Sequence, residues 1–398
     1  MRILQIASSY PVDETDTTAP FVRSIARALA ANGHELQIIV PWRENMPERT
    51  SEPGITVHWV SYAPMAWLNV IGHGRSLVSD TRLRLATVAA LPFFLIAAWF
   101  RAAMIVRVWK PDVAHSHWVL PGGLVGAVIA RLSRIPHAVN LHGSDIYIAN
   151  SRRLYQSIAR WVFRNTRQVF ACSPYLAEKA ILLGADPGRT HFLPHGVDSV
   201  NFMAREDFQR DGDTLIVLAA GRLVEKKGFR ALVENAEIFL DSHPTAQLWI
   251  AGDGDDKVLL EQAVASKNTS TGHRIHLLGR VPWSHMPELL RKVDVFAMPS
   301  ISDSHGNQDG LPTVVLEAMS CGAAVVTSDI GGTRSVVEDG VSGIVVPSGD
   351  SIRFARAIDE LLSDPSRIER ISLAGSEVVR FRYAWAAVAD QMEQAFHE

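Results

Sequence analysis

The chain has 398 residues, of which 47% are hydrophobic and 20% charged, with a formal net charge of −3. This length exceeds one typical domain and suits two domains of about 200 residues, each with its own core. The N-terminal segment MRILQIASSYP is too short and too lightly charged for a secretion signal. Cys172 and Cys321 lie in apolar segments, which favours reduced, buried thiols and a cytoplasmic protein.

Charge is distributed unevenly along the chain. Residues 1–198 contain 20 basic and 13 acidic side chains, a net charge of +7, whereas residues 199–398 contain 19 and 29, a net charge of −10. A basic first half favours contact with an anionic membrane surface or with an acceptor that carries a pyrophosphate. Ordinary variation in surface charge is the alternative.

Short apolar segments alternate with helical stretches, which is typical of parallel βαβ units. A helix is expected over Val22–Asn32, with Gly33 as its left-handed stop. The strands expected in the first half are Ile3–Ala7, Leu36–Val40, Thr56–Val60, Val113–His115, His137–Leu141, Gln168–Ala171 and His191–Leu193. A second series follows at Leu215–Ala219, Gln247–Ala251, Arg274–Leu277, Val295–Met298, Ala323–Val326 and Gly343–Val346.

The most apolar segment is Leu85–Phe100, which contains Pro92 and is flanked by arginines. It falls short of the roughly twenty residues that span a bilayer. Two interpretations remain: a buried helix pair broken at Pro92, or an interfacial helix lying on the cytoplasmic leaflet.

The polar run Asp198–Asp213 reads as a linker between two domains. The sequence therefore predicts an N-terminal domain over 1–198 and a C-terminal domain over 199–375. The amphipathic stretch 376–398 is expected to form a terminal helix. Both domains are expected to be Rossmann-like, with ligands at the carboxyl ends of their strands.

The segment DGLPTVVLEAMSCGAAVVTSD, residues 309–329, is the most informative part of the chain. A Gly310-Leu311-Pro312 turn opens a helix in which Pro312 suits the first helical position, so the free N–H groups beyond it form a phosphate site. Asp309 precedes that site and Glu317 lies about two turns along the helix. An anion cradle between two carboxylates suits a sugar nucleotide, although a surface helix followed by a buried strand would give the same pattern.

This segment resembles the E-x7-E signature of retaining glycosyltransferases of family 4, which have the GT-B fold, with Asp309 in place of the first glutamate. The aspartate side chain is shorter by about one C–C bond, roughly 1.5 Å. The resemblance implies that Asp309 holds the hydroxyls of the donor sugar and that Glu317 holds the ribose hydroxyls. It also implies that Gly310, Leu311, Pro312 and Thr313 line the donor site, and that a C-terminal helix crosses back to the first domain.

GRLVEKKGF, which begins at Gly221, resembles a second motif of the same family. Arg222 and Lys227 match its cations, which would stabilise charge on the departing pyrophosphate, although Lys226 makes that match ambiguous by one residue. A solvated loop is the plain alternative. Further along, Gly252 resembles the family's glycine turn beside the nucleotide, and Gly279, Arg280 and Val281 would lie against the base.

In the first domain, NLHGSDI places His142 where the family has an active-site histidine, whose ring or backbone meets the donor sugar. Asp145 is expected to cap the next helix. His115 and His117 are interpreted as packing or acceptor-side residues. Ala19-Pro20 replaces a glycine pair near the diphosphate, which predicts a different backbone approach there.

No metal or other cofactor is expected. Asp253-Gly254-Asp255 reads as D-x-D, but the cations and the helix N-terminus already supply the charge that a metal would provide. His115, His117 and His142 lack a nearby fourth ligand for zinc. The expected partners are a nucleotide sugar and a glycan or lipid-linked acceptor, with peripheral membrane contact and no nucleic acid.

The alternatives to a glycosyltransferase in polysaccharide or glycolipid assembly are an epimerase, a dehydrogenase and a non-catalytic scaffold. A sugar-nucleotide epimerase would need acid–base groups in the first domain, and the motifs of the second domain argue against it. A dehydrogenase would need G-x-G-x-x-G after the first strand, which QIASSYP lacks. The only support for a non-catalytic scaffold is that Asp309 stands where the family signature has glutamate.

Overall fold

A computed structural model describes residues 1–13, 16, 18–72, 77–79, 82–83, 85–204, 213–304 and 311–398. The chain forms two compact units, here called unit 1 (residues 1–195 and 385–398) and unit 2 (residues 196–384). The first division lies three residues before the predicted boundary at 198, and the second lies nine residues after the predicted boundary at 375. Both units are built on parallel sheets, so the predicted α/β class with two Rossmann-like domains is confirmed.

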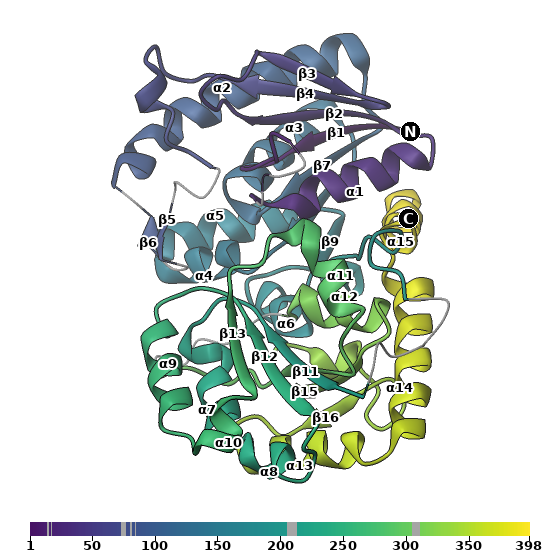
Figure 1. Ribbon diagram of the computed structural model, residues 1–398. Coiled ribbons are helices and arrows are strands. Elements are labelled where there is room, and N and C mark those ends of the chain that lie inside the picture. Colours follow the sequence, from purple (N-terminus) through teal and green to yellow (C-terminus); the bar gives the residue numbers. More distant parts are fainter. Residues whose placement is uncertain are drawn as a thin grey trace. The chain divides into compact units, whose positions relative to one another are not determined.

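Unit 1 contains an eight-stranded sheet in the order β10-β9-β8-β7-β1-β2-β4-β3 (Figure 1). All neighbours are parallel except the edge pair β3–β4, which is antiparallel. The polar strand β3 was not predicted. The strands are β1 Arg2–Ile6, β2 Glu35–Pro41, β3 Arg49–Glu52, β4 Ile55–Val60, β7 Val113–His117, β8 His137–Leu141, β9 Gln168–Ala171 and β10 Thr190–Phe192. A separate antiparallel pair joins β5 (Leu77–Ser79) to β6 (Arg82–Leu83).

The helices of unit 1 are α1 Pro20–Ala31, α2 Leu85–Trp109, α3 Leu124–Ser133, α4 Ser144–Ser151, α5 Arg153–Arg164, α6 Pro174–Leu182 and α15 Trp385–His397. Gly33 follows α1 with a φ of 83°, which confirms the predicted left-handed stop. The C-terminal helix α15 lies beside α1 (Figure 1), and Asn32 donates to Asp390 Oδ1 at 2.7 Å. Its buried residues Val388, Met392 and Phe396 join the core formed by α1 and β1.

Helix α2 is continuous through Pro92, so the prediction of a helix pair broken there is wrong. Pro92 lacks the N–H that would bond to the carbonyl of Val88, and both residues are exposed, so water can reach that carbonyl. By length and composition alone, its 25 residues are apolar enough to cross a membrane, with 28% of the apolar window buried. One face, with Phe94, Ala98 and Ala102, packs on the sheet residues Leu4, Ile6 and Ile39.

Unit 2 contains a six-stranded, fully parallel sheet in the order β13-β12-β11-β14-β15-β16. Its strands are β11 Leu215–Ala220, β12 Ala246–Ala251, β13 Ile275–Gly279, β14 Val295–Met298, β15 Ala324–Ser328 and β16 Ile344–Val346. Its helices are α7 Phe229–Glu234, α8 Glu237–Leu240, α9 Lys257–Ala265, α10 Thr269–Gly272, α11 Met286–Leu290, α12 Thr313–Ser320, α13 Ser351–Leu362 and α14 Pro365–Val378. The aspartates Asp350 and Asp364 cap α13 and α14 through the N–H groups of Arg353 and Arg367.

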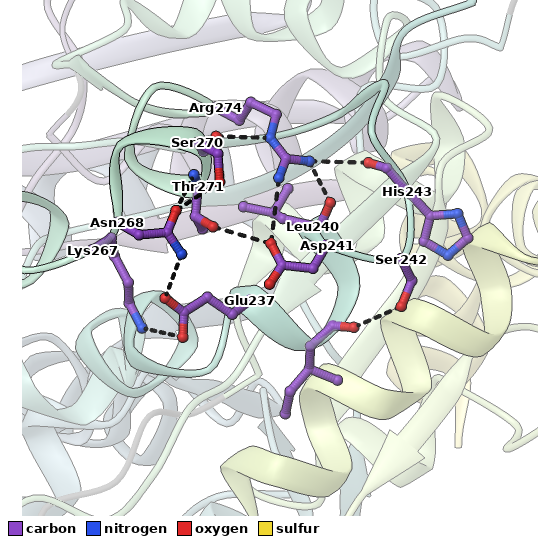
Figure 2. A network of polar contacts seen from close by, with 11 residues as sticks. Glu237, Leu240, Asp241, Ser242, His243, Lys267, Asn268, Ser270, Thr271 and Arg274 are labelled. Atoms are coloured by element: carbon purple, nitrogen blue, oxygen red, sulfur yellow. Dashed lines mark hydrogen bonds and ion pairs between the residues drawn. The ribbon is translucent and has the colours of Figure 1, made fainter.

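A polar network fixes the amino-terminal end of β13 (Figure 2). Arg274, which precedes β13, donates to the carbonyls of Leu240 and His243 and forms an ion pair with Asp241 at 3.5 Å. Asp241 also accepts from Thr271. These contacts hold the end of α8 and α10 against the start of β13. This end of β13 is opposite to its carboxyl edge.

Candidate active site

Three glycines pack together where β11, β12 and β13 end. Gly221 N donates to the carbonyl of Ala251 at 3.0 Å, and Gly252 N donates to the carbonyl of Gly279 at 2.8 Å. A Cβ at Gly252 would lie 1.9 Å from the carbonyl oxygen of Gly221, so only glycine fits there. The predicted donor residues Gly221 and Gly252 therefore share one carboxyl edge, with Arg280 and Val281 directly following β13.

The cations of the GRLVEKKGF segment lie at this edge. The end of the Lys227 side chain lies over Gly221, at the end of β11. A Cβ added to this glycine would be 3.3 Å from Cε and 3.6 Å from Nζ of Lys227. This contact favours Lys227 over Lys226 as the cation of the site. Arg222 is exposed, and within the described residues its guanidinium has no carboxylate partner.

The loop after β14 is attached to the cation loop. Ile301 N donates to the carbonyl of Lys226 at 2.9 Å, and Ser304 donates through its N–H and hydroxyl to the two carboxylate oxygens of Glu225. Since β11 and β14 are neighbours in the sheet, both loops leave the same edge. The next residues, including Asp309 and Gly310, lie outside the described residues.

Helix α12 begins at Thr313, and Pro312 is its N-cap in an extended conformation with φ −69° and ψ 120°. The prediction that Pro312 is the first helical residue is therefore wrong by one position. Within the described part of the chain, the N–H groups of Thr313 and Val314 have no acceptor, whereas Val315 N donates to the carbonyl of Pro312. The positive end of α12 thus stays available to an anion.

Glu317 projects from α12 beside Trp283, whose Nε1 donates to Glu317 Oε1 at 3.3 Å. Burial raises the pKa of the Glu317 carboxyl to about 7, and the hydrogen bond from Trp283 opposes that shift. The indole ring also packs against Phe202, with centroids 5.3 Å apart, and stays 45% exposed. Trp283 was not among the predicted site residues, although Pro282-Trp283 directly follows the predicted Arg280 and Val281.

In unit 1, Asp145 holds the backbone around His142. Its carboxylate is buried and accepts from the N–H groups of Val119 at 2.9 Å, His142 at 3.2 Å and Gly143 at 3.0 Å. Gly143 is the residue at the N-cap of α4, so the prediction that Asp145 is a simple cap is wrong. Burial raises the pKa of the Asp145 carboxyl, and the three N–H donors oppose this.

His142 lies among aromatic rings. The Phe21 ring is 4.3 Å from the His142 ring and 4.4 Å from the His195 ring, and Trp118 lies 4.9 Å from His142. Two non-glycine residues here have positive φ, Ala19 at 52° and Trp118 at 63°. Ala19 thus takes a left-handed conformation that a glycine would adopt more easily, and such strain is concentrated at functional sites.

Of the two histidines interpreted as packing or acceptor-side residues, His115 packs inside the sheet. His115 is fully buried, and its Nε2 lies 2.7 Å from Asn140 Oδ1 on the neighbouring strand. Within the described residues, no three histidine, cysteine, aspartate or glutamate side chains are arranged to hold a metal ion. In the D-x-D turn, Asp253 Oδ1 accepts from Gly254 N at 3.0 Å.

Two family models cover most of the chain. The glycosyl transferase 4-like domain matches residues 17–196, and glycosyl transferases group 1 matches residues 202–378. The fold and these matches define a glycosyltransferase of the GT-B type. The chain belongs to the glycosyl transferases group 1 family, which confirms the resemblance seen in the sequence.

Relatives with assigned activities match over most of their length. The 2-deoxystreptamine N-acetyl-D-glucosaminyltransferase of Streptomyces fradiae is 28% identical over 93% of this chain and 87% of its own. The D-inositol 3-phosphate glycosyltransferase of Acidothermus cellulolyticus is 28% identical over 91% and 82%.

Solved structures support the fold. The sucrose-phosphate synthase of Thermosynechococcus elongatus superposes with a TM-score of 0.72 at 21% identity, covering 100% of this chain and 98% of that one. An Anabaena protein crystallised with UDP gives 0.70 at 17% identity, with 100% of both chains covered.

Proposed function

We propose that the protein is a retaining, metal-independent transferase that moves a sugar from a nucleoside-diphosphate-sugar to an acceptor hydroxyl. The main observation behind this proposal is that the Arg222–Lys227 loop and the loop after β14 leave the same sheet edge and are hydrogen-bonded to each other. Two cations and a helix N-terminus there suit a leaving pyrophosphate. The relatives that transfer N-acetylglucosamine or act on inositol phosphate support the reaction class.

Each residue has a proposed role. Arg222 and Lys227 stabilise charge on the leaving phosphate, Glu317 accepts from the ribose hydroxyls, and Asp309 accepts from the donor sugar. The acceptor oxygen forms its bond to the anomeric carbon while the bond from that carbon to phosphate breaks. The acceptor proton passes to the leaving phosphate oxygen on the same face, so no enzyme nucleophile is needed and the anomeric configuration is kept.

The function is tested by screening nucleotide sugars by thermal shift, since a ligand of the folded state raises its stability, and then assaying transfer. We expect turnover that survives EDTA and an anomer identical to that of the donor, as read by NMR. Loss of turnover on chelation with recovery in Mg²⁺ or Mn²⁺ contradicts metal independence. Binding without turnover of any sugar favours the scaffold.

Glu317 makes donor affinity pH-dependent. Burial raises the pKa of its carboxyl to about 7, and ribose hydroxyls donate more strongly to the ionised carboxylate than to the neutral acid. The ionised fraction rises about tenfold between pH 6 and pH 8, so the apparent affinity for a nucleotide sugar should rise by up to about that factor. Calorimetry at both pH values measures this change. In Glu317→Gln, affinity is expected to be weaker and independent of pH, and an equal slope in that variant would show that another group titrates.

We also propose a peripheral contact between α2 and an anionic membrane, which places the protein on the cytoplasmic face and suits a lipid-linked acceptor in glycolipid or polysaccharide assembly. An apolar stripe runs along α2 opposite its packed face, and each member is more than half exposed: Leu85, Phe93, Ile96, Phe100, Met104 and Val108. Trp67, in the short 3₁₀ helix Ala66–Leu68, is 71% exposed. Residues 53–111 contain six arginines or lysines and a single acid, Asp80, which suits anionic headgroups.

Vesicle sedimentation tests the membrane contact. We expect binding to equimolar phosphatidylglycerol and phosphatidylcholine at low salt, and weaker binding as salt screens the charges. Phe93→Ser/Ile96→Ser/Phe100→Ser removes about 1 kcal/mol per side chain, so partitioning falls roughly a hundred-fold. Leu154→Ser/Leu182→Ser, at similarly exposed sites on α5 and α6, is the control. If binding changed neither with lipid charge nor with the triple substitution, the proposed contact between α2 and the membrane would be wrong.

A further inference from the structure

Three histidines of unit 1 form a chain of hydrogen bonds, here called the histidine column. His117 Nδ1 lies 3.0 Å from His142 Nε2, and His142 Nδ1 lies 3.0 Å from His195 Nε2. The three residues come from the carboxyl ends of β7, β8 and β10, which lie on one side of the sheet centre. Both ring nitrogens of His142 are therefore used within the protein, which leaves its ring without a polar atom for a substrate.

Gln5 determines the direction of the column. It is fully buried on β1, and its Nε2 faces His117 Nε2 at hydrogen-bond distance. In the orientation that the Gln5 amide has here, its nitrogen donates to His117 Nε2, so His117 Nε2 accepts and His117 Nδ1 carries the proton. His142 then accepts at Nε2 and donates from Nδ1, and His195 accepts at Nε2. The proton of His195 is thus placed on Nδ1, at the far end of the column.

We propose that His195, not His142, presents the polar imidazole group of unit 1 to the substrate, donating its Nδ1–H to a phosphate or sugar oxygen. Gln5, His117 and His142 are positioning residues that fix its tautomer. Within the described residues, His195 Nδ1 has no acceptor, and the side chain is partly exposed. Any contact of His142 with a ligand then falls to its backbone. The catalytic part of this inference rests on the proposed function.

The surroundings hold the column in one neutral state. Phe21 stacks on His195 at an interplanar angle of 11°, and His115 lies beside His117 with ring centroids 4.7 Å apart. The buried carboxyl of Asp145 bonds to the backbone N–H groups of residues 119, 142 and 143, not to an imidazole. Burial keeps the pKa of all three imidazoles below the usual value, which supports one proton per ring.

The tautomers are measured without any activity. In the full chain labelled with ¹⁵N-histidine, long-range ¹H–¹⁵N correlations at pH 7 should show His117, His142 and His195 neutral and protonated on Nδ1, with assignments from single His→Asn variants. A proton on Nε2 of any member, or a charged ring, overturns the column. In Gln5→Leu the single tautomer is expected to become a mixture. Gln168→Leu, which removes an equally buried glutamine from His191, should leave the column unchanged.

The substrate contact is tested at His195. Saturation with the donor should shift the Nδ1 signal; a shift with the nucleoside diphosphate alone assigns a phosphate oxygen, and a shift only with the complete donor assigns a sugar oxygen. His195→Ala should lower kcat about tenfold with KM nearly unchanged. His195→Asn keeps an N–H near the Nδ1 position and should recover most of the rate. No shift on saturation, or Ala and Asn variants that are equally active, overturns the contact. If no donor is turned over by the wild type, the proposed function fails while the tautomers still decide the column.

Discussion

Acidification from pH 7.5 to 5.5 is expected to destabilise unit 1 by on the order of 5 kcal/mol. Burial lowers the pKa of His115 and His195 to about 4 and that of His137 to about 3, and it places those of His117 and His142 well below 6.5. In the unfolded chain these imidazoles titrate near 6.5, so between pH 6.5 and about 4 the unfolded state binds more protons. Each contributes roughly 1.4 kcal/mol per pH unit, and folded domains have only about 5–15 kcal/mol in total.

In unit 1, Asp145 has the opposite effect on stability, because a carboxyl with a raised pKa favours the folded state in acid. One carboxyl does not offset five imidazoles. Urea unfolding followed by tryptophan fluorescence measures the effect, since eight of the ten tryptophans lie in unit 1. The midpoint should fall steadily below pH 6.5 and be flat above pH 7. If the pH dependence of the unfolding free energy between pH 6.5 and 5 corresponded to uptake of less than one proton on unfolding, these rings would be charged in the folded protein.

The fold was predictable because fully buried parallel strands read as short apolar runs, and the expected strands match the observed ones to within two residues at each end. The errors have local causes. Strand β3 (RTSE) is polar because it pairs only at an edge, so it gives no hydrophobic signal. The helix α2 continues through Pro92 because the ring lies on the exposed face, which residue type alone does not reveal.

At the candidate site, contacts between residues of one motif were predictable from the sequence, whereas contacts between residues of different motifs were not. Gly221 and Lys227 belong to one motif, and they are in contact. Trp283 and Glu317 are 34 residues apart in sequence, so their hydrogen bond depends on how two loops pack. The histidine column depends likewise on the sheet order, which places β1, β7 and β8 side by side. His195 in LPHGVD had no signal of its own beyond its place after a strand.

Removal of the Arg222 guanidinium is expected to lower kcat/KM by about 1.5–3 kcal/mol, or roughly ten- to a hundred-fold, while leaving the fold intact. Arg222 is exposed, so Arg222→Ala breaks no ion pair or side-chain hydrogen bond with any described residue. A cation that meets charge developing on the leaving phosphate acts more on the transition state than on the ground state, so most of the loss should appear in kcat. Arg222→Lys restores the charge without the two-pronged geometry and should lie between wild type and alanine.

Two controls make the result specific. Lys227→Ala should resemble Arg222→Ala because its Nζ lies over Gly221 at the same edge, whereas Lys226→Ala should stay within about threefold of wild type. Arg274→Ala also removes an arginine from unit 2, but this side chain fixes the backbone at the opposite end of β13 (Figure 2). That variant should lower Tm and keep kcat/KM per folded molecule. If Arg222→Ala instead lowered Tm at full activity, Arg222 would be a structural residue, and the leaving phosphate would be stabilised by Lys227 and the N-terminus of α12 alone.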